Sequence, residues 1–388
     1  MIALRKSTLL ACTLLFSITV SGGPADSDYS RLYAEARACY ESGRNEACDS
    51  LITELQALKL KRLQRRKVSS LLLDNAFVTN RREDLRQALN SRFVRRSLDR
   101  TDYRYWSLIS ELPPTEAVWP GDRVTVPFKQ LGQPGHTLYG VEVSVNGREL
   151  TGSLDNCASD YCETSPEIAE ALGIRPIGKK IKINGNRRAQ SYIGIADSLS
   201  LGDLVVRNVL FSVSDSFVSI GEALSIDLVI GDNVFRQTGD LIIDNTEESV
   251  TFSRYTLDLC PNVLRAYPEH DYYVEASQDG KEVMMLLDFG NTNTYMNVRF
   301  VEKYPPDEPY AESTTRITMQ DQTWTTKSYL MEKPRFELFG TACEWDRIDI
   351  WLEGYGGRRG LGSFVADMLR QYGLVVFNAR QQYLQLTR

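Results

Sequence analysis

The chain has 388 residues, of which 42% are hydrophobic and 25% charged, and its formal net charge is −6. Such a composition is typical of a globular protein with two or three domains. Acidic residues dominate after about residue 115, which argues against a nucleic-acid partner, because nucleic-acid phosphates require a basic surface. With only two histidines and no Cys-x-x-Cys pair, we expect no metal site, and nothing in the sequence indicates a cofactor.

Residues 1–25 have the features of a secretory signal peptide. Arg5 and Lys6 precede an apolar run over residues 9–20, and small residues follow at 21–25. The apolar run is too short to span a bilayer comfortably, and no other stretch of the sequence could do so. We therefore expect a cleaved signal peptide, a secreted or periplasmic protein and no membrane span.

Six cysteines remain after such a cleavage, and an even number in an exported protein favours disulfides. Buried unpaired thiols are the alternative. Both histidines, His136 and His270, are expected in surface or loop positions. The predicted disulfides are Cys39 with Cys48, Cys157 with Cys162, and Cys260 with Cys343.

Residues 26–115 are predicted to form a helical domain. Apolar residues recur at helical spacing on both sides of Gly43, which predicts two helices joined by a turn at this glycine. The helical pattern ends at Pro113 and Pro114, because proline cannot continue a helix. Further helices are predicted over residues 64–79, 81–97 and 103–111.

From about residue 123 the apolar residues alternate with a period of two, which is typical of strands. Two stretches in this region have the same design. In residues 152–159 small and apolar residues lead into Asp155, and in residues 284–292 four apolar residues lead into Asp288. A strand that ends in an Asp and a tight turn can present a carboxylate at the floor of a cleft.

The two copies stay in step beyond the Asp residues. Asp155 and Asp288 lie 133 residues apart, and Gly231 and Gly362 lie 131 residues apart. Later apolar runs begin at positions 241 and 375, which are 134 residues apart. A constant period of this kind indicates a tandem duplication with small insertions and deletions. We therefore predict two lobes, one over residues 122–256 and one over residues 262–388.

Each half resembles a retropepsin-type lobe of the aspartic proteases. The pattern of that family is an apolar pair, Asp-Thr-Gly-Ala/Ser-Ser, a helix ending near Leu-Gly, a flap hairpin, and an apolar-Leu-Gly run before a last helix and strand. Residues 166–174 provide the expected helix in the first copy. The resemblance implies a mainly β fold with two retropepsin-like β-barrel lobes, preceded by the α-helical N-terminal domain.

The resemblance also implies that Asp155 and Asp288 form a catalytic dyad. Two facing carboxyl groups cannot both ionise at low cost, so they share a proton. The ionised member then activates a water while the protonated member polarises the carbonyl of a peptide or protein substrate. This chemistry hydrolyses peptide bonds without a metal or another cofactor.

Four further residues are expected around the substrate by the same resemblance. Tyr192 belongs to a predicted flap hairpin over residues 181–193, which has a counterpart at 316–329; an ordinary exposed hairpin is the alternative. The other three, which follow the Asp residues in sequence, are Asn156, Phe289 and Gly290.

The sequence departs from the family pattern in the two motifs. Asn156 and Phe289 stand where the family has Thr or Ser, and of the two only Asn156 can make a side-chain hydrogen bond. Cys157 replaces the glycine that Gly290 retains in the second copy. These changes favour a second hypothesis, a catalytically inactive homologue that binds extended peptides. A third possibility is an adaptor whose function depends on the helical domain.

Overall fold

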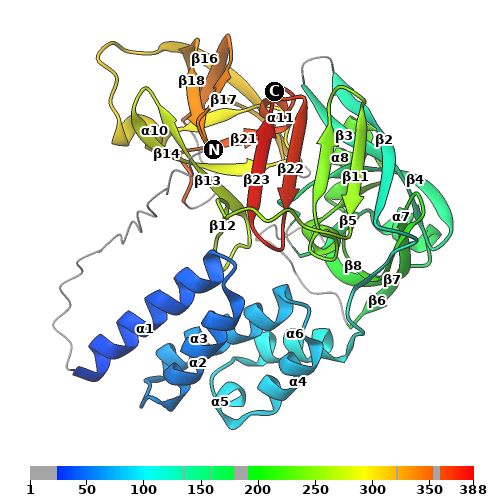
Figure 1. Ribbon diagram of the computed structural model, residues 1–388, viewed down its shortest axis with the longest axis vertical. Coiled ribbons are helices and arrows are strands. Elements are labelled where there is room, and N and C mark those ends of the chain that lie inside the picture. Colours follow the sequence, from blue (N-terminus) through cyan, green and yellow to red (C-terminus); the bar gives the residue numbers. More distant parts are fainter. Residues whose placement is uncertain (1–23, 134–135, 159, 179–190, 320–321, 353–358) are drawn as a thin grey trace, which may run out of the picture.

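The computed structural model describes residues 24–133, 136–158, 160–178, 191–319, 322–352 and 359–388. Nearly all of the predicted signal peptide and residues 181–190 of the first predicted flap lie outside the described residues. Within the described part of the chain, no helix is long and apolar enough to span a bilayer. Figure 1 shows the N-terminal helices, in blue and cyan, below two groups of strands.

The N-terminal helices pack around an apolar core largely of their own. Helices α1 (Pro24–Glu41) and α2 (Asn45–Ala57) form the predicted pair, and Gly43 in their turn has a φ of +72°, a conformation that favours glycine. The run predicted over 81–97 is divided, because Ser91 leaves the helical conformation and its side chain caps a new helix. The remaining helices of this part are α3 (Arg62–Val78), α4 (Arg82–Asn90), α5 (Arg92–Arg95) and α6 (Arg100–Glu111).

In lobe 1, the strand that leads into Asp155 lies between other strands of the sheet. Strand β4 (Arg148–Leu154) pairs in parallel with β9 (Leu228–Ile230), which pairs antiparallel with β5 (Cys162–Thr164). Asp155 therefore follows β4 beside the end of β9. The other elements are β1 (Glu116–Val118), β2 (Arg123–Gln133), β3 (His136–Val145), β6 (Arg175–Ile177), β7 (Ser191–Leu201), β8 (Leu204–Ser214), β10 (Leu241–Asp244), β11 (Ser249–Ser253), α7 (Pro166–Ala171), α8 (Phe217–Leu224) and α9 (Asp232–Phe235).

Lobe 2 repeats this arrangement. Strand β14 (Lys281–Asp288) pairs in parallel with β21 (Gly362–Val365), which pairs antiparallel with β15 (Tyr295–Asn297). Strands β16 (Ala311–Met319) and β17 (Gln322–Glu332) form the hairpin predicted as the second flap. The other elements are β12 (Leu264–Arg265), β13 (Tyr272–Gln278), β18 (Arg335–Leu338), β19 (Thr341–Glu344), β20 (Arg347–Trp351), β22 (Leu374–Asn378), β23 (Tyr383–Thr387), α10 (Val298–Lys303) and α11 (Ala366–Leu369).

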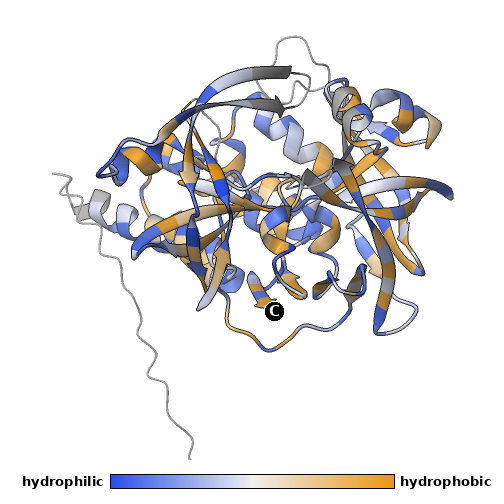
Figure 2. Cartoon of the chain, turned by 90° about the horizontal axis from the view of Figure 1, so that it is seen from above, coloured by the Kyte–Doolittle hydropathy of each residue, from blue (hydrophilic) through white to orange (hydrophobic). Residues whose placement is uncertain are grey.

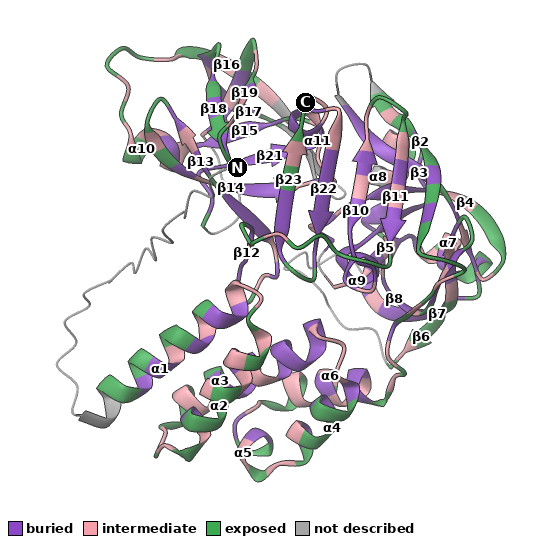
Figure 3. Cartoon of the chain, viewed as in Figure 1, coloured by how far each residue is buried: buried purple, intermediate pink, exposed green. Residues whose placement is uncertain are grey.

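The two lobes are joined by one antiparallel sheet in the order β11, β10, β22, β23. Ile242 of β10 lies opposite Val376 of β22, which is its counterpart in the duplication. Because a residue of one lobe pairs with the equivalent residue of the other lobe, a local two-fold axis relates the two lobes. Figure 3 shows β10 and β22 side by side; buried and intermediate residues alternate in β10, and β22 is mostly buried.

A single large apolar core runs through both lobes. A second apolar cluster joins the N-terminal helices to the lobes. This second cluster includes Ile193, Ile195 and Leu210 of lobe 1, so the helices do not form a separate body tethered by a linker. Figure 2 shows apolar and polar segments alternating along the strands of both lobes, as expected for sheets with one buried face. The predicted fold class, mainly β with two lobes and N-terminal helices, is confirmed.

Candidate active site

The two predicted catalytic residues occupy equivalent turns at the ends of β4 and β14. In lobe 1 the Cys157 N–H donates to Asp155 Oδ1 at 2.7 Å, and in lobe 2 the Gly290 N–H donates to Asp288 Oδ1 at 3.0 Å. Each carboxyl group therefore accepts a hydrogen bond from the backbone two residues further along. This contact fixes the direction in which each acid points.

The structure brings Asp155 and Asp288 face to face between the lobes. One carboxylate oxygen of each residue and the Cys157 Sγ all lie within 4.8 Å of one another. Gly290 makes this approach possible, because a Cβ atom at this position would lie 2.2 Å from Asp155 Cγ. The glycine that the sequence retains after Asp288 is thus needed to make room for the acid of the other lobe.

Asn156 links the two turns across the lobes. Its Nδ2 donates to the Leu287 carbonyl at 2.8 Å, and its Oδ1 accepts from the Phe289 N–H at 2.7 Å. One amide side chain, fully buried, thus binds the backbone on both sides of Asp288. Since it holds the opposite turn through two directed bonds, Asn156 positions the acids relative to each other.

Phe289 stabilises the same region by packing. Its side chain is fully buried, and its ring lies 5.1 Å from that of Phe377 with the planes at 72°. The equivalent positions in the two lobes therefore have different roles, with Asn156 polar and Phe289 apolar. Neither side chain is exposed, so both support the turns from within the protein. Their expected contact with a substrate stays a prediction.

Tyr192 lies at the start of β7, where it is paired with Val213 of β8 and partly buried against the core of lobe 1. Burial raises the pKa of its phenol. The flap residues that precede it, up to residue 190, are outside the described residues, so its expected contact with substrate stays a prediction.

The environment of the dyad favours one shared proton. Burial raises the pKa of Asp155, while hydrogen bonds from the N–H groups of Cys157, Ala158 and Gly290 oppose that rise. Burial, followed by the negative charge of Asp155, raises the pKa of Asp288 well above its ordinary value. The two carboxyl groups therefore titrate as a pair that holds one proton in common, and Asp155 accepts more backbone hydrogen bonds than Asp288.

Glu163 in β5 is an acidic group near the dyad that sequence analysis missed. Burial, and then the charge of Asp155, raise its pKa to about 7. It follows Cys162 in an apparently ordinary strand, and no sequence signal distinguishes it from an exposed Glu.

The three predicted disulfides are absent from the described part of the chain, because each would need at least one of the free thiols Cys39, Cys48, Cys162, Cys260 and Cys343. The Cys157 Sγ points across the lobe boundary and donates to the Leu287 carbonyl at 3.4 Å, whereas the Cys162 Sγ donates to Asn233 Oδ1 at 3.6 Å inside lobe 1. These side chains leave their backbones in different directions, so a short loop does not join them. Cys343 is buried beside the Tyr372 hydroxyl and Cys260 is exposed, while Cys39 and Cys48 are buried among the helices.

Asp155, Cys157 and Asp288 together offer three donor atoms that could hold a metal ion. A thiol must lose its proton to bind a metal. Burial, and then the charge of Asp288, raise the pKa of Cys157 well above its ordinary value, which works against metal binding. The geometry fits the sharing of a proton better than the coordination of a cation.

His270 lies in the loop between β12 and β13, which is one of the two positions expected from sequence, but it is buried there. It is 4% exposed, and its Nδ1 lies 2.8 Å from Asp160 Oδ1, five residues beyond Asp155. On the other side its Nε2 lies 3.8 Å from Asp74 Oδ1 of helix α3. The histidine therefore contacts lobe 1 and the helical part at once, a long-range arrangement that local sequence patterns do not reveal.

Comparison with known proteins agrees with this geometry. Residues 141–234, which include Asp155 and most of lobe 1, match the family model described as aspartyl protease. No curated protein matches the sequence.

Solved structures that resemble the chain include an aspartic proteinase from Irpex lacteus (12% identity, TM-score 0.42, covering 68% of this chain and 97% of that one). A retropepsin-like aspartic protease from Rickettsia conorii has 16% identity and a TM-score of 0.25 over 36% of this chain and 92% of its own. Basic 7S globulin from soybean has 11% identity and a TM-score of 0.37 over 69% and 95%. Likenesses this distant add nothing on activity. The resemblance to the aspartyl protease family that the sequence motifs predict is confirmed over residues 141–234.

Proposed function

We propose that the protein is an exported aspartic endopeptidase whose dyad is Asp155 and Asp288. The observation that carries this proposal is the approach of the two carboxyl groups to within 4.8 Å across the lobe boundary, in surroundings that raise the pKa of both. Two acids that hold one proton between them are suited to act as base and acid in one reaction.

In the proposed reaction, the ionised Asp155 takes a proton from a water molecule, whose oxygen attacks the carbonyl carbon of the peptide bond. The protonated Asp288 gives its proton to the carbonyl oxygen, which yields a neutral tetrahedral diol. Transfer of a proton to the peptide nitrogen and cleavage of the C–N bond then release an amine and a carboxylic acid. The cross-lobe bonds of Asn156 keep the two acids in position throughout.

Export is proposed from residues 1–25 of the sequence alone. Sequencing the N-terminus of the mature protein, recovered from a bacterial host in separate cytoplasmic, periplasmic and extracellular fractions, tests it. A full-length chain confined to the cytoplasm would contradict the proposal.

The second candidate is a catalytically inactive homologue that binds peptides, and the position of Cys157 favours it. The thiol occupies space within 4.8 Å of both carboxylates, where a catalytic water would have to be placed. A site that tolerates this side chain could retain affinity for an extended peptide and lack turnover. The function resides in the details of the site, which differ here from the family pattern.

Incubation of the purified chain with a denatured protein mixture, from about pH 3 to about pH 8, separates these two candidates. For the endopeptidase, we expect cleavage that falls by roughly 100- to 10,000-fold in both Asp155→Asn and Asp288→Asn, because each acid transfers a proton. The exposed Asp197→Asn serves as a matched control and should leave cleavage unchanged. No cleavage by the wild type, with saturable peptide binding in all variants, would establish the inactive homologue.

A further inference from the structure

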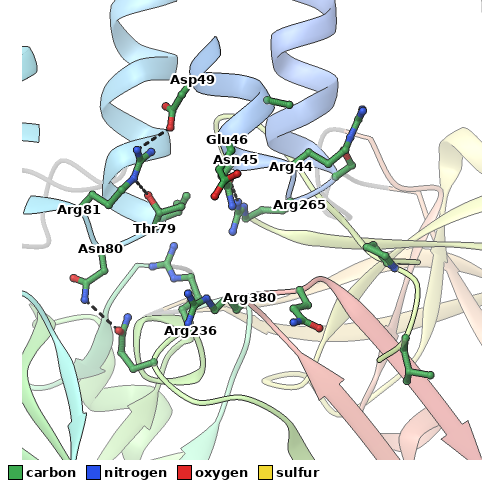
Figure 4. Close-up of a pocket in the computed structure, with 18 residues that line it drawn as sticks. Arg44, Asn45, Glu46, Asp49, Thr79, Asn80, Arg81, Arg236, Arg265 and Arg380 are labelled. Carbon is green, nitrogen blue, oxygen red and sulfur yellow. Dashed lines mark hydrogen bonds and ion pairs between the residues drawn. The ribbon is translucent and has the colours of Figure 1, made fainter. Parts of the chain in front are cut away.

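A cavity of about 1040 Å³ lies at the junction of the helical part with both lobes, remote in sequence from the acidic turns (Figure 4). Its walls come from the α1–α2 turn, the α3–α4 turn, the segment after α9, the segment between the lobes and the β22–β23 turn. The residues that line it are mostly polar. Cavities of this size are typical of small-molecule sites.

Positive charge is concentrated in this cavity, although the whole chain is acidic. Five arginines and two acids, Glu46 and Asp49, line it. Two of the arginines are neutralised, because Arg81 pairs with Asp49 and Asp84, and Arg236 pairs with Asp160 and Asp232. The other three form no ion pair within the described residues, which leaves an excess of positive charge. Such an excess of one sign in a concave site raises the local concentration of oppositely charged ligands. The arginines come from all three parts of the molecule and are Arg44, Arg81, Arg236, Arg265 and Arg380.

Arg265 indicates most directly that the cavity accommodates an anion. It is 1% exposed, and its Nη2 donates to Asn45 Oδ1 at 3.3 Å while the guanidinium lies 4.8 Å from the centre of the Tyr40 ring. Within the described part of the chain it forms no ion pair, and its buried Nε has no hydrogen-bond partner. The Asp232 carboxylate acts on the Arg265 guanidinium only from beyond ion-pair distance and already pairs with Arg236. An external anion would therefore stabilise this buried guanidinium.

Two helix N-termini provide independent evidence. Helix α2 begins at Asn45 and helix α4 begins at Arg82, and the residues just before each start line the cavity. Neither N-cap makes a side-chain hydrogen bond, whereas Asp99 caps α6 and Ser165 caps α7. Uncapped N-termini carry unsatisfied N–H groups and a partial positive charge, and both features favour anions.

We propose that this cavity binds a small polyanion that carries two or more phosphate or carboxylate groups. Arg44 and Arg380 are exposed at opposite walls, and the buried Arg265 lies between segments of the helical part and lobe 2, so a ligand with several anionic groups could contact all three. Since these residues belong to different parts of the molecule, the ligand would hold the helices on the lobes. A ligand that binds only the folded assembly raises its stability.

The test uses the full chain, with inorganic tripolyphosphate and citrate as separate probes at constant ionic strength. Isothermal titration measures affinity and differential scanning measures Tm. We expect saturable binding and a rising Tm with at least one probe, and the preferred probe distinguishes phosphate from carboxylate recognition. Proteolytic activity is not measured, so the result is independent of the proposed peptidase.

Matched variants locate the binding. In Arg44→Ala/Arg380→Ala the affinity should fall roughly tenfold or more, because two charge-assisted contacts are removed. The double variant Arg92→Ala/Arg347→Ala, exposed arginines outside the cavity, changes the net charge equally and should bind as the wild type does. Arg265→Gln should also weaken binding. Absence of saturable binding to both probes, or equal binding by the cavity and control variants, would overturn the proposal.

Discussion

At the scale of single residues, equivalent positions in the two lobes stabilise the site by different interactions. Asn156 provides both directed hydrogen bonds across the boundary, and Phe289 at the equivalent position provides only apolar packing. The sequence predicts that Asn156 could hydrogen-bond and that Phe289 could not, and this is what the structure contains. The partners of Asn156 could not be predicted, because they depend on how closely the lobes approach.

Asn156→Ala should lower the free energy of unfolding by about 1–3 kcal/mol, because the buried Phe289 N–H loses its bond to Asn156 and the Leu287 carbonyl keeps only the weak bond from Cys157 Sγ. Urea denaturation followed by fluorescence measures the change. Asn156→Thr, with the residue type of the family pattern, should recover part of the loss. A change below about 0.5 kcal/mol in the alanine variant would show that these bonds do not hold the lobes together.

The cysteines permit a second test at this scale. In the folded protein, iodoacetamide should modify the exposed Cys260 roughly tenfold faster than Cys157, because burial raises the pKa of the latter thiol and only the thiolate reacts. Mass spectrometry of peptides measures both rates. After denaturation without a reductant, all six cysteines of the described region should be alkylated. Any pair that requires a reductant first would contradict the structure.

At the scale of elements, β9 and β21 pair in parallel with the strands that lead into Asp155 and Asp288. A glycine beside each acidic turn lets these strands lie close to neighbouring backbone. A Cβ on Gly231, at the end of β9, would lie 2.0 Å from the Tyr161 carbonyl oxygen. A Cβ on Gly362, at the start of β21, would lie 2.3 Å from the Tyr295 carbonyl oxygen. The spacing of these glycines reveals the duplication, and the structure shows the physical reason for both, a backbone crossing with no room for a side chain.

Gly231→Ala and Gly362→Ala should each destabilise the protein by about 3 kcal/mol or more, because a backbone oxygen cannot move aside as a flexible side chain would. Gly121→Ala is the control, since nothing lies within 4 Å of a Cβ at that position. Thermal unfolding of the three variants provides the comparison. Equal Tm values for Gly231→Ala and Gly121→Ala would refute the crowding argument.

Local patterns and long-range contacts differ in how far they could be predicted. The helices, the strands that lead into each Asp and the lobe repeat follow from periodicity and spacing, which can be read from the sequence. The break at Ser91, the direction of the Cys157 side chain and the burial of His270 depend on packing between segments far apart in sequence. The arginine-lined cavity also could not be predicted from local patterns, because its walls come from separate parts of the chain.

At the scale of the whole molecule, the helical part and the two lobes meet at a buried ionic cluster. His270 lies between Asp160 of lobe 1 and Asp74 of helix α3, with the ring of Tyr40 about 6.1 Å away. Arg236 also pairs with Asp160, at 3.4 Å, and with Asp232, at 3.2 Å. The junction therefore contains groups that titrate near neutral pH, and their protonation is linked to the stability of the assembly.

The sign of this linkage follows from Asp74 and His270, which change between pH 5 and 8. Asp232, whose pKa burial raises to about 6, and Glu163 titrate in the same window, and both shifts have the same sign. Burial raises the pKa of Asp74 to about 7. Although burial opposes the change, the Asp160 carboxylate raises the pKa of His270. Both groups bind protons more tightly in the folded state, so their stabilisation is complete at low pH. For Asp74 it is lost as the pH rises from the ordinary pKa of a carboxyl group to about 7, and for His270 it is lost as the pH rises through its raised pKa. Burial alone would raise the pKa of Asp160, but His270 and Arg236 lower it to about 2. The contribution of Asp160 to the free energy of unfolding is therefore constant in this window.

The free energy of unfolding should therefore fall by about 2 kcal/mol or more between about pH 5.5 and pH 8, as estimated for a carboxyl group whose pKa is near 7 when folded and ordinary when unfolded. Urea denaturation at a series of pH values measures this slope. Asp74→Asn retains the shape of the side chain without its titration and should flatten the slope, whereas the exposed Asp197→Asn should not. A wild-type slope that is zero or rises with pH would show that these groups do not share their protons across the junction. If the slope persists in Asp74→Asn and disappears in His270→Gln, the histidine alone is the group that links pH to the attachment of the helices.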